Sequence, residues 1–199
     1  MKISLAVVSC ALLGSLAMSA FAADAAPEAD HVEQVLVING CPIWPYTRCP
    51  GVDLSHADLS LRDLAGADLT GAKLVRADLR SANLAGAILD GADLSAARLQ
   101  KANIPAALLR GARLVATDLE FVRMFRADLS NADLSMANME AARATHARFH
   151  GARLIDVNMQ ETKFQEADFR NAVMKNCHTR FAVFLDVSFE GCDGCPVDW

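Results

Sequence analysis

The sequence lacks several features that mark common functional classes. Its 199 residues carry 19 Lys or Arg against 24 Asp or Glu, a formal net charge of −5, so it has no excess of basic residues for nucleic-acid binding. It contains no phosphate-binding glycine loop and no evident pairing of a nucleophile with a general base. The apolar stretch Ile3 to Leu16 is too short for a comfortable transmembrane helix. These absences argue against nucleic-acid binding, against catalysis and against stable insertion into a membrane.

The apolar residues also lack the periods of ordinary secondary structure. In ADLSNADLSMANM, residues 127–139, a large apolar residue recurs at every fifth position, as Leu129, Leu134 and Met139. An α-helix turns about 100° per residue, so a step of five would scatter these side chains around its surface. A β-strand alternates with period 2, so the same step would change faces each time. The pattern therefore predicts a chain that turns a corner every five residues and presents the same inward surface after each corner.

This five-residue register runs through most of the chain. Large residues recur from Leu54 to Phe189 in 28 consecutive pentapeptides without insertion or deletion, and only Ala144 and Thr179 depart in size or polarity. The residue two positions before each large one is small almost throughout, most often Ala, with Arg62 and four slightly larger Val residues among the exceptions. We therefore expect two positions in five to point inward, while the other three carry the charge.

The pattern closely resembles the A-(D/N)-L-x-x motif of the pentapeptide-repeat family over residues 52–191. The resemblance implies an all-β fold, a right-handed quadrilateral parallel β-helix in which each pentapeptide forms one wall and four pentapeptides form a coil. The 28 repeats would then make about seven coils, a rod on the order of 34 Å long at ~4.8 Å per coil. Such a stack needs caps at its ends.

Two sets of residues spaced by 20 support this coil length independently. The last position of every fourth repeat is Gly or Asn, which predicts one corner with a left-handed turn residue. These residues are Gly71, Gly91, Gly111, Asn131, Gly151, Asn171 and Gly191. Residues of alternating sign recur on another wall, namely Asp53, Lys73, Asp93, Arg113, Asp133 and Arg153. Exposed pairs of this kind are worth only ~0–1 kcal/mol each, so we interpret the ladder as a structural feature.

Residues 1–22 have the pattern of a secretory signal peptide. Lys2 supplies the basic start, a short apolar stretch follows, and Ala20-Phe21-Ala22 fits a small-x-small cleavage site. We therefore expect cleavage after Ala22 and a periplasmic or secreted product. Residues 23–51 would form a flexible lead-in and an N-terminal cap, residues 52–191 the β-helix, and residues 192–199 a C-terminal cap.

Five cysteines would remain after cleavage, and they lie at the caps or in the last coils. Export favours disulfides, and Cys41–Cys49 is the preferred pair. Cys192–Cys195 is a second candidate, with pairing of Cys177 to either of them as the alternatives, so one thiol is left over. Cys192 and Cys195 also have the C-x-x-C form of thiol oxidoreductases and of half a zinc site. The βαβ context and further ligands that those functions need are not evident.

Other polar residues give no site either. His146 and His150 lie in adjacent repeats, but two histidines alone rarely bind a metal. The many aspartates recur because the repeat recurs, and an exterior wall offers no cleft that would shift their pKa. We therefore expect no catalytic residue, no cofactor and no metal.

The segment EFVRMFRAD places Phe121 and Phe125 at outward positions, flanked by Arg123 and Arg126. Aromatic and Arg residues together suit a protein contact surface, although scattered exposed apolar residues are common on any protein. We expect a non-enzymatic interaction scaffold for an unknown protein partner. The family resemblance implies an alternative, a mimic of duplex DNA that protects DNA gyrase, which the signal peptide and the uninterrupted repeat disfavour. A thiol-redox or metal-binding role through Cys192 and Cys195 is a second alternative.

Overall fold

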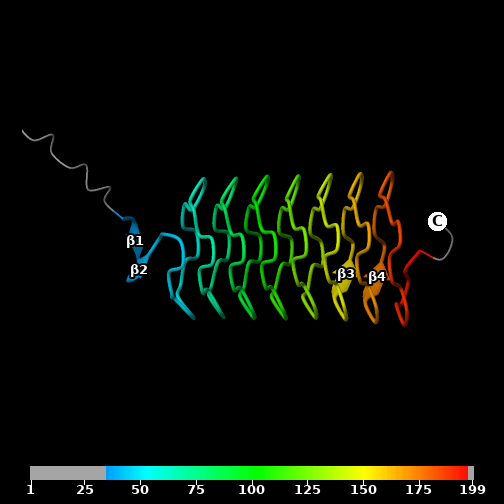
Figure 1. Cartoon of the computed structure of the whole chain (residues 1–199), viewed down its shortest axis with the longest axis horizontal. Coiled ribbons are helices and arrows are strands. Elements are labelled where there is room, and N and C mark those ends of the chain that lie inside the picture. Colours follow the sequence, from blue (N-terminus) through cyan, green and yellow to red (C-terminus); the bar gives the residue numbers. More distant parts are fainter. Residues whose placement is uncertain (1–34, 197–199) are drawn as a thin grey trace, which may run out of the picture. The chain divides into compact units, whose positions relative to one another are not determined.

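In the computed structural model of the protein, residues 35–196 are described, and they form a stack of coils (Figure 1). The expected signal peptide with its cleavage site at Ala22, and most of the expected lead-in, lie outside these residues. The described chain has four short strands: β1 (Val37–Ile38), β2 (Cys41–Pro42), β3 (Arg153–Ile155) and β4 (Val173–Lys175). β1 and β2 pair as an antiparallel hairpin, and β3 pairs with β4 in parallel.

Isolated parallel bridges hold the rest of the stack together. They join residues 20 positions apart, from Arg48 with Asp68 to Val173 with Asp193. The repeat of 20 residues confirms that four pentapeptides make one coil. The chain is a right-handed quadrilateral parallel β-helix, as the five-residue period and the family resemblance predict.

We name the five positions of a pentapeptide, in chain order, small, ladder, centre, turn-1 and turn-2. One example is the set Ala127, Asp128, Leu129, Ser130 and Asn131. We name the four walls A, B, C and D after successive ladder residues of one coil, which are Asp68, Lys73, Asp78 and Asn83.

Backbone hydrogen bonds explain why the coils depend on each other. The centre N–H of Leu54 donates to the Lys73 carbonyl of the next coil (2.7 Å), and the ladder N–H of Lys73 donates back to the Val52 carbonyl (2.9 Å). The turn-2 N–H makes a third bond between coils, whereas the small-position N–H of Ala57 closes a turn on Leu54 (3.1 Å). Three of these four recurring bonds therefore join neighbouring coils, and an isolated coil would leave most of its backbone donors unpaired.

Every turn-2 residue from His56 to Gly191 has a positive φ. The sequence predicts this conformation for the Gly/Asn corner alone, and the structure extends it to all four corners. Non-glycine residues adopt it throughout, for example Arg76 and Phe121, both at φ 56°. A positive φ at the third residue is typical of a type II turn. It costs an L-residue roughly 1–2 kcal/mol, which the bond of the turn-2 N–H to the next coil helps to offset.

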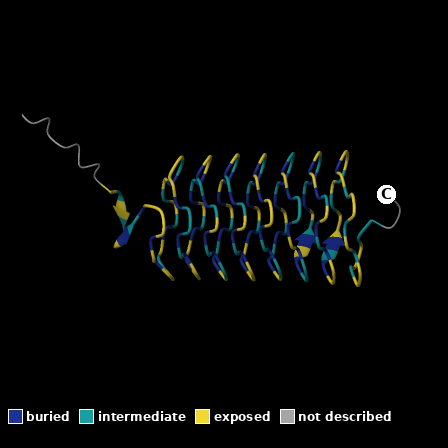
Figure 2. Ribbon diagram, viewed as in Figure 1, coloured by how far each residue is buried: buried dark blue, intermediate teal, exposed yellow. Residues whose placement is uncertain are grey.

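The centre and small positions fill the interior of the β-helix (Figure 2). Every centre from Leu54 to Phe169 is fully buried, including Ala144. Leucines dominate the first coils, and phenylalanines replace them toward the C-terminal end. There the rings of Phe149 and Phe169 stack at a centroid distance of 4.6 Å, and Phe164 stacks on Phe184 at 5.0 Å. The inward surface predicted from the period is therefore one continuous apolar core.

The hydrogen-bonded stack begins one pentapeptide earlier than the boundary at residue 52 drawn from the sequence. Residues 47–51 already occupy the five positions, with Thr47 and Cys49 buried and the Cys49 N–H donating to the Asp68 carbonyl (2.8 Å). At the other end the ladder continues past residue 191 to Asp193. Thr and Cys occupy the inward positions here where the motif has Ala and Leu, so the motif does not match this first repeat.

Disulfides join cysteines at both ends of the described β-helix. Cys41 of β2 is bonded to Cys49, with their Cα atoms 5.8 Å apart, so the hairpin is tied to the first pentapeptide. Cys192 is bonded to Cys195, and Cys177 remains a free, partly buried thiol. Within residues 35–196 there is no helix of the length and apolarity needed to cross a membrane.

Candidate interaction surface

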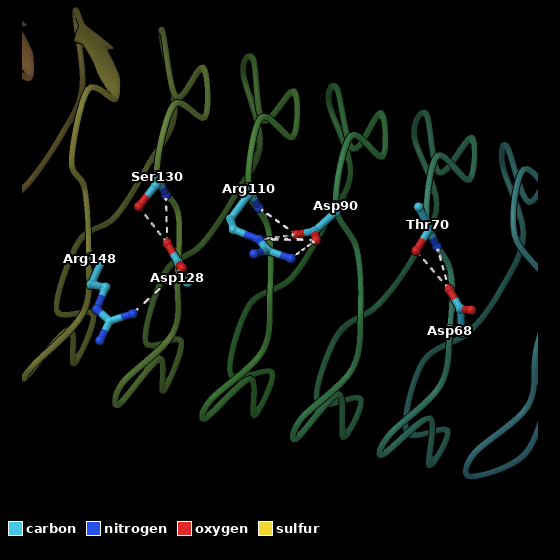
Figure 3. Close-up of polar contacts among 7 residues, drawn as sticks. All are labelled: Asp68, Thr70, Asp90, Arg110, Asp128, Ser130 and Arg148. Carbon is cyan, nitrogen blue, oxygen red and sulfur yellow. Dashed lines mark hydrogen bonds and ion pairs between the residues drawn. The ribbon is translucent and has the colours of Figure 1, made fainter.

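The ladder carboxylates have a structural task at each turn. The recurring backbone bonds leave the turn-1 N–H without a backbone acceptor, and the ladder side chain supplies one. Asp68 accepts the N–H of Thr70 (3.2 Å) and its hydroxyl (2.7 Å), and Asp128 does the same for Ser130 at 3.0 and 2.6 Å (Figure 3). These bonds, above all the one from the Thr70 side chain, hold the pKa of Asp68 below its ordinary value. Asp68 is therefore held ionised as a turn acceptor.

On three walls, the ladder residues bring opposite charges close together. On wall B, Arg113 lies between Asp93 and Asp133 in the bridge register. On wall C, Arg98 Nη1 lies 3.6 Å from Asp78 Oδ2. Wall A places Arg148 between two aspartates, with its Nη1 3.9 Å from Asp128 Oδ2 (Figure 3). Because neighbouring coils are only ~4.8 Å apart, each of these cations is neutralised by the aspartates that it faces.

Wall D is different, because three cations follow one another on its ladder. Arg123, Arg143 and Lys163 are bridged in register across three successive coils, and all three are exposed. The two members that directly precede them, Asn83 and Asn103, are neutral, and Asn103 Nδ2 donates to Asn83 Oδ1 at 3.1 Å; Asp63 begins the ladder. Sequence reasoning missed this stack, although the spacing of 20 residues would have revealed it.

The four residues predicted from the sequence to form a contact surface lie on wall D of one coil. Phe121 stands at the corner between walls C and D, Arg123 at the ladder position, Phe125 at turn-1 and Arg126 at the following corner. Phe121 is 48% exposed and Phe125 42% exposed. The structure thus places all four on the outside and on the same wall.

The two phenylalanines differ in how firmly they are held. The Arg126 guanidinium lies 4.9 Å from the Phe125 ring centroid, and His146 of the next coil packs edge-on against the same ring at 5.2 Å. Phe121 instead lies between two surface hollows. One, of about 530 Å³, lies along wall C and includes Arg80, Arg98 and Glu120 in its lining. The other, of about 410 Å³, opens on the cations of wall D.

The cysteines and histidines do not gather into a chemical site. Among residues 35–196, no group of three or more His, Cys, Asp or Glu could hold a metal ion. Cys192 and Cys195 are joined as a disulfide, so neither offers a thiolate. The Cys177 thiol donates to the Leu154 carbonyl (3.2 Å), and burial raises its pKa, which lowers its reactivity.

Comparisons with known proteins agree with this architecture. The family model for pentapeptide repeats matches in eight copies, with matched windows that run from residue 47 to residue 160. None of the curated protein sequences matches the chain significantly. Among solved structures, a trypsin-treated variant of QnrB1, a plasmid-mediated fluoroquinolone resistance protein, is 18% identical with a TM-score of 0.59, covering 75% of this chain and 82% of its own.

A second similar structure is HetL from the cyanobacterium Nostoc sp. strain PCC 7120, a pentapeptide repeat protein involved in the regulation of heterocyst differentiation. It is 26% identical and covers 74% of this chain and 89% of its own, with a TM-score of 0.28. At 18% identity, the structural likeness to QnrB1 concerns the fold alone. Because the family model covers more than half of the residues and the coil repeat agrees with it, the chain belongs to the pentapeptide-repeat family.

Proposed function

We propose that the protein is an exported, non-catalytic scaffold that binds a protein partner through wall D. The observation that carries this proposal is the alignment of Phe121, Arg123, Phe125 and Arg126 on one wall of one coil, from corner to corner. Exposed aromatic and Arg side chains on a rigid support are the usual anchors of protein interfaces. Pentapeptide-repeat proteins are in general structural or interaction scaffolds rather than enzymes, which supports the same conclusion.

The alternative of gyrase protection by DNA mimicry finds less support. Duplex DNA is uniformly negative along its backbone, and a mimic needs a comparable surface. The stack of Arg123, Arg143 and Lys163 gives this β-helix a positive stretch across three successive coils of wall D. Export to the periplasm or the medium, which we propose from residues 1–22, would also separate the protein from gyrase.

Capture from periplasm or culture medium with the full chain as bait tests the scaffold. The Phe121→Ala, Phe125→Ala double variant should retain the melting temperature of the parent and lose partner capture by roughly thirtyfold, since truncating a central aromatic costs ~2 kcal/mol or more. Leu61→Ala is the matched control, because Leu61 is an exposed turn-2 residue at the same corner as Phe121. If the double variant captures the partner as well as the parent does, wall D is not the contact surface.

The mass of the mature protein tests export. Cleavage after Ala22 removes the 22 N-terminal residues, and the product should be recovered outside the cytoplasm. A full-length cytoplasmic product would contradict the proposed compartment and would restore the gyrase alternative.

A further inference from the structure

The stack of cations on wall D carries an energetic cost that the ladder cations of the other walls avoid, because each of those faces at least one aspartate. Like charges directly opposite each other on neighbouring strands destabilise a sheet. Arg143 faces Arg123 on one side and Lys163 on the other, whereas Arg113 on wall B faces an aspartate on both sides. The same ladder geometry is therefore neutralised on wall B and left unneutralised on wall D. A ligand that supplied negative charge would remove this repulsion.

The hollow beside the ladder has the same charge imbalance. The lining of the 410 Å³ hollow contains Lys101, Arg123, Arg143 and Lys163, against the single carboxylate of Glu161. Phe121 also lines the hollow, and its side chain is exposed. The site thus combines four cations with one aromatic side chain, which suits a partner that presents carboxylates next to apolar residues.

We infer that this basic ladder binds an acidic helix of a protein partner, aligned with the axis of the β-helix. The inference rests on the proposed scaffold function and specifies the chemistry of its partner. Carboxylates on one face of that helix pair with Arg123, Arg143 and Lys163 in turn, and apolar residues beside them pack on Phe121.

The spacing of the ladder favours a helix over an extended strand. Successive cations are separated by one coil, about 4.8 Å. Carboxylates three or four residues apart on a helix recur about every 5.4 Å. Same-side residues of a strand recur about every 6.7 Å. Three cations therefore match a helical face to within about 1 Å, a difference that flexible Arg and Lys side chains absorb.

The test uses a defined probe, an Ala-rich helical peptide with Glu at every third or fourth position along one face and Leu beside it. An isomer of the same composition, with its Glu residues spread around the helix, is the peptide control, and polygalacturonate is a non-peptide polyanion. The one-faced peptide should bind the full chain more tightly at low ionic strength than at high, because screening weakens exposed charge pairs. The isomer and polygalacturonate should bind at least tenfold more weakly.

A matched pair of double variants separates the ladder from net charge. Arg143→Gln with Lys163→Gln should weaken binding of the one-faced peptide about tenfold, whereas Arg113→Gln with Arg153→Gln should leave it unchanged. Both pairs remove two exposed cations from ladder positions. Equal losses in the two variants, equal binding of the isomer, or tighter binding of polygalacturonate would each overturn the inference.

Failure of the inference and failure of the scaffold function give different results. Phenylalanine-dependent capture of a partner without binding of the acidic peptide would refute the acidic helix and leave the scaffold in place. The opposite result has two parts: the ladder variants weaken peptide binding, and the Phe121 and Phe125 substitutions leave partner capture unchanged. It would refute the contact surface of the proposed function and support the ladder.

Discussion

The carboxylate of Asp90 accepts the backbone N–H of Arg110 across two neighbouring coils, with N and Oδ1 2.9 Å apart (Figure 3). On the same wall, Asp68 and Asp128 cap turn-1 donors within their own pentapeptides. The ladder position before Arg110 is Leu108, which has no acceptor, and the adjacent coil supplies one. The Arg110 guanidinium binds the same carboxylate. Asp90 therefore binds both the backbone and the side chain of Arg110, and replaces the acceptor that is lost because Leu108 stands where the motif has Asp or Asn.

Removing this acceptor should destabilise the β-helix. We expect Asp90→Ala to lower the free energy of unfolding by ~1 kcal/mol, as loss of a helix-capping side chain does, because the Arg110 N–H loses its partner. Asp90→Asn retains an acceptor and should cost less. In a Leu108→Asn background, where the local turn acceptor is restored, Asp90→Ala should cost less again. Denaturant unfolding measures the parent and the four variants, and equal costs of Asp90→Ala in both backgrounds would show that the cap is not shared in this way.

Stability should decline in acid because several carboxylates on the walls, at ladder and turn-1 positions, have a lowered pKa. Hydrogen bonds from Ser60 and Thr70 side chains lower the pKa of Asp58 and Asp68, and the Arg110 guanidinium lowers that of Asp90. A pKa below the ordinary 3.8 in the folded state means that the ionised form stabilises the fold. This contribution is complete above about pH 5 and is lost as the pH falls through 3.8 toward the folded pKa values.

The corresponding measurement is the denaturant midpoint from pH 2 to pH 8. The midpoint should be nearly constant above about pH 5 and fall steadily below about pH 4. Asp68→Asn keeps the turn acceptor without a titrating group, so its decline should be shallower than that of the parent. An identical decline in parent and variant would show that Asp68 does not contribute to the loss of stability in acid.

If the centre residues point inward, replacing a centre leucine should destabilise the protein much more than replacing an exposed leucine. Leu94 is fully buried, whereas Leu61 at a turn-2 position is 81% exposed. Leu94→Ala should cost ~3 kcal/mol or more because it leaves a cavity in a packed core, and Leu61→Ala should change the free energy of unfolding by less than ~0.5 kcal/mol. Thermal and denaturant unfolding report both values. Similar costs at the two positions would contradict the assignment.

Neutralising the middle cation of wall D should make the protein more stable. Arg143→Gln removes repulsion with Arg123 and Lys163 and should raise the free energy of unfolding by a few tenths of a kcal/mol to ~1 kcal/mol. Arg113→Gln on wall B, which loses two attractive neighbours, should have no effect or the opposite one. In about 1 M salt both effects should vanish, since screening is then effective beyond ~3 Å. A loss of stability in Arg143→Gln would show that its side chain makes favourable contacts instead.

The repeat made the architecture readable from the sequence, because one position in five had to be large and another small. The same regularity concealed two features. The first pentapeptide was missed because Cys49 and Thr47 occupy its inward positions, and a motif of Leu and Ala does not recognise them although both are buried. The stack of cations on wall D is not apparent from local motifs, because its members lie 20 residues apart in the sequence.

The corners show why local residue preference was a poor guide to backbone conformation. Gly and Asn occupy one corner, yet all four corners have a positive φ. At that one corner a side chain explains the need for glycine after asparagine: a Cβ on Gly151 would lie 2.5 Å from Asn131 Oδ1 in the preceding coil. At Gly71, Gly91 and Gly111 no atom lies within 4 Å of such a Cβ, so neighbouring side chains do not require glycine there. Cross-coil bonding imposes the same turn on Arg76 or Phe121 despite their preferences.

The closed coil of four equal walls gives insertions and deletions an unusual meaning in evolution. Adding or losing 20 residues changes the length of the rod and keeps every downstream side chain on its original wall. Adding or losing five residues instead rotates everything downstream by a quarter turn, while Leu still follows Leu in the core. A single duplicated pentapeptide ahead of Phe121 would therefore carry the aromatic pair and the stacked cations to a new side of the molecule in one step, so that a lineage of such proteins can reorient its surfaces without redesigning its interior.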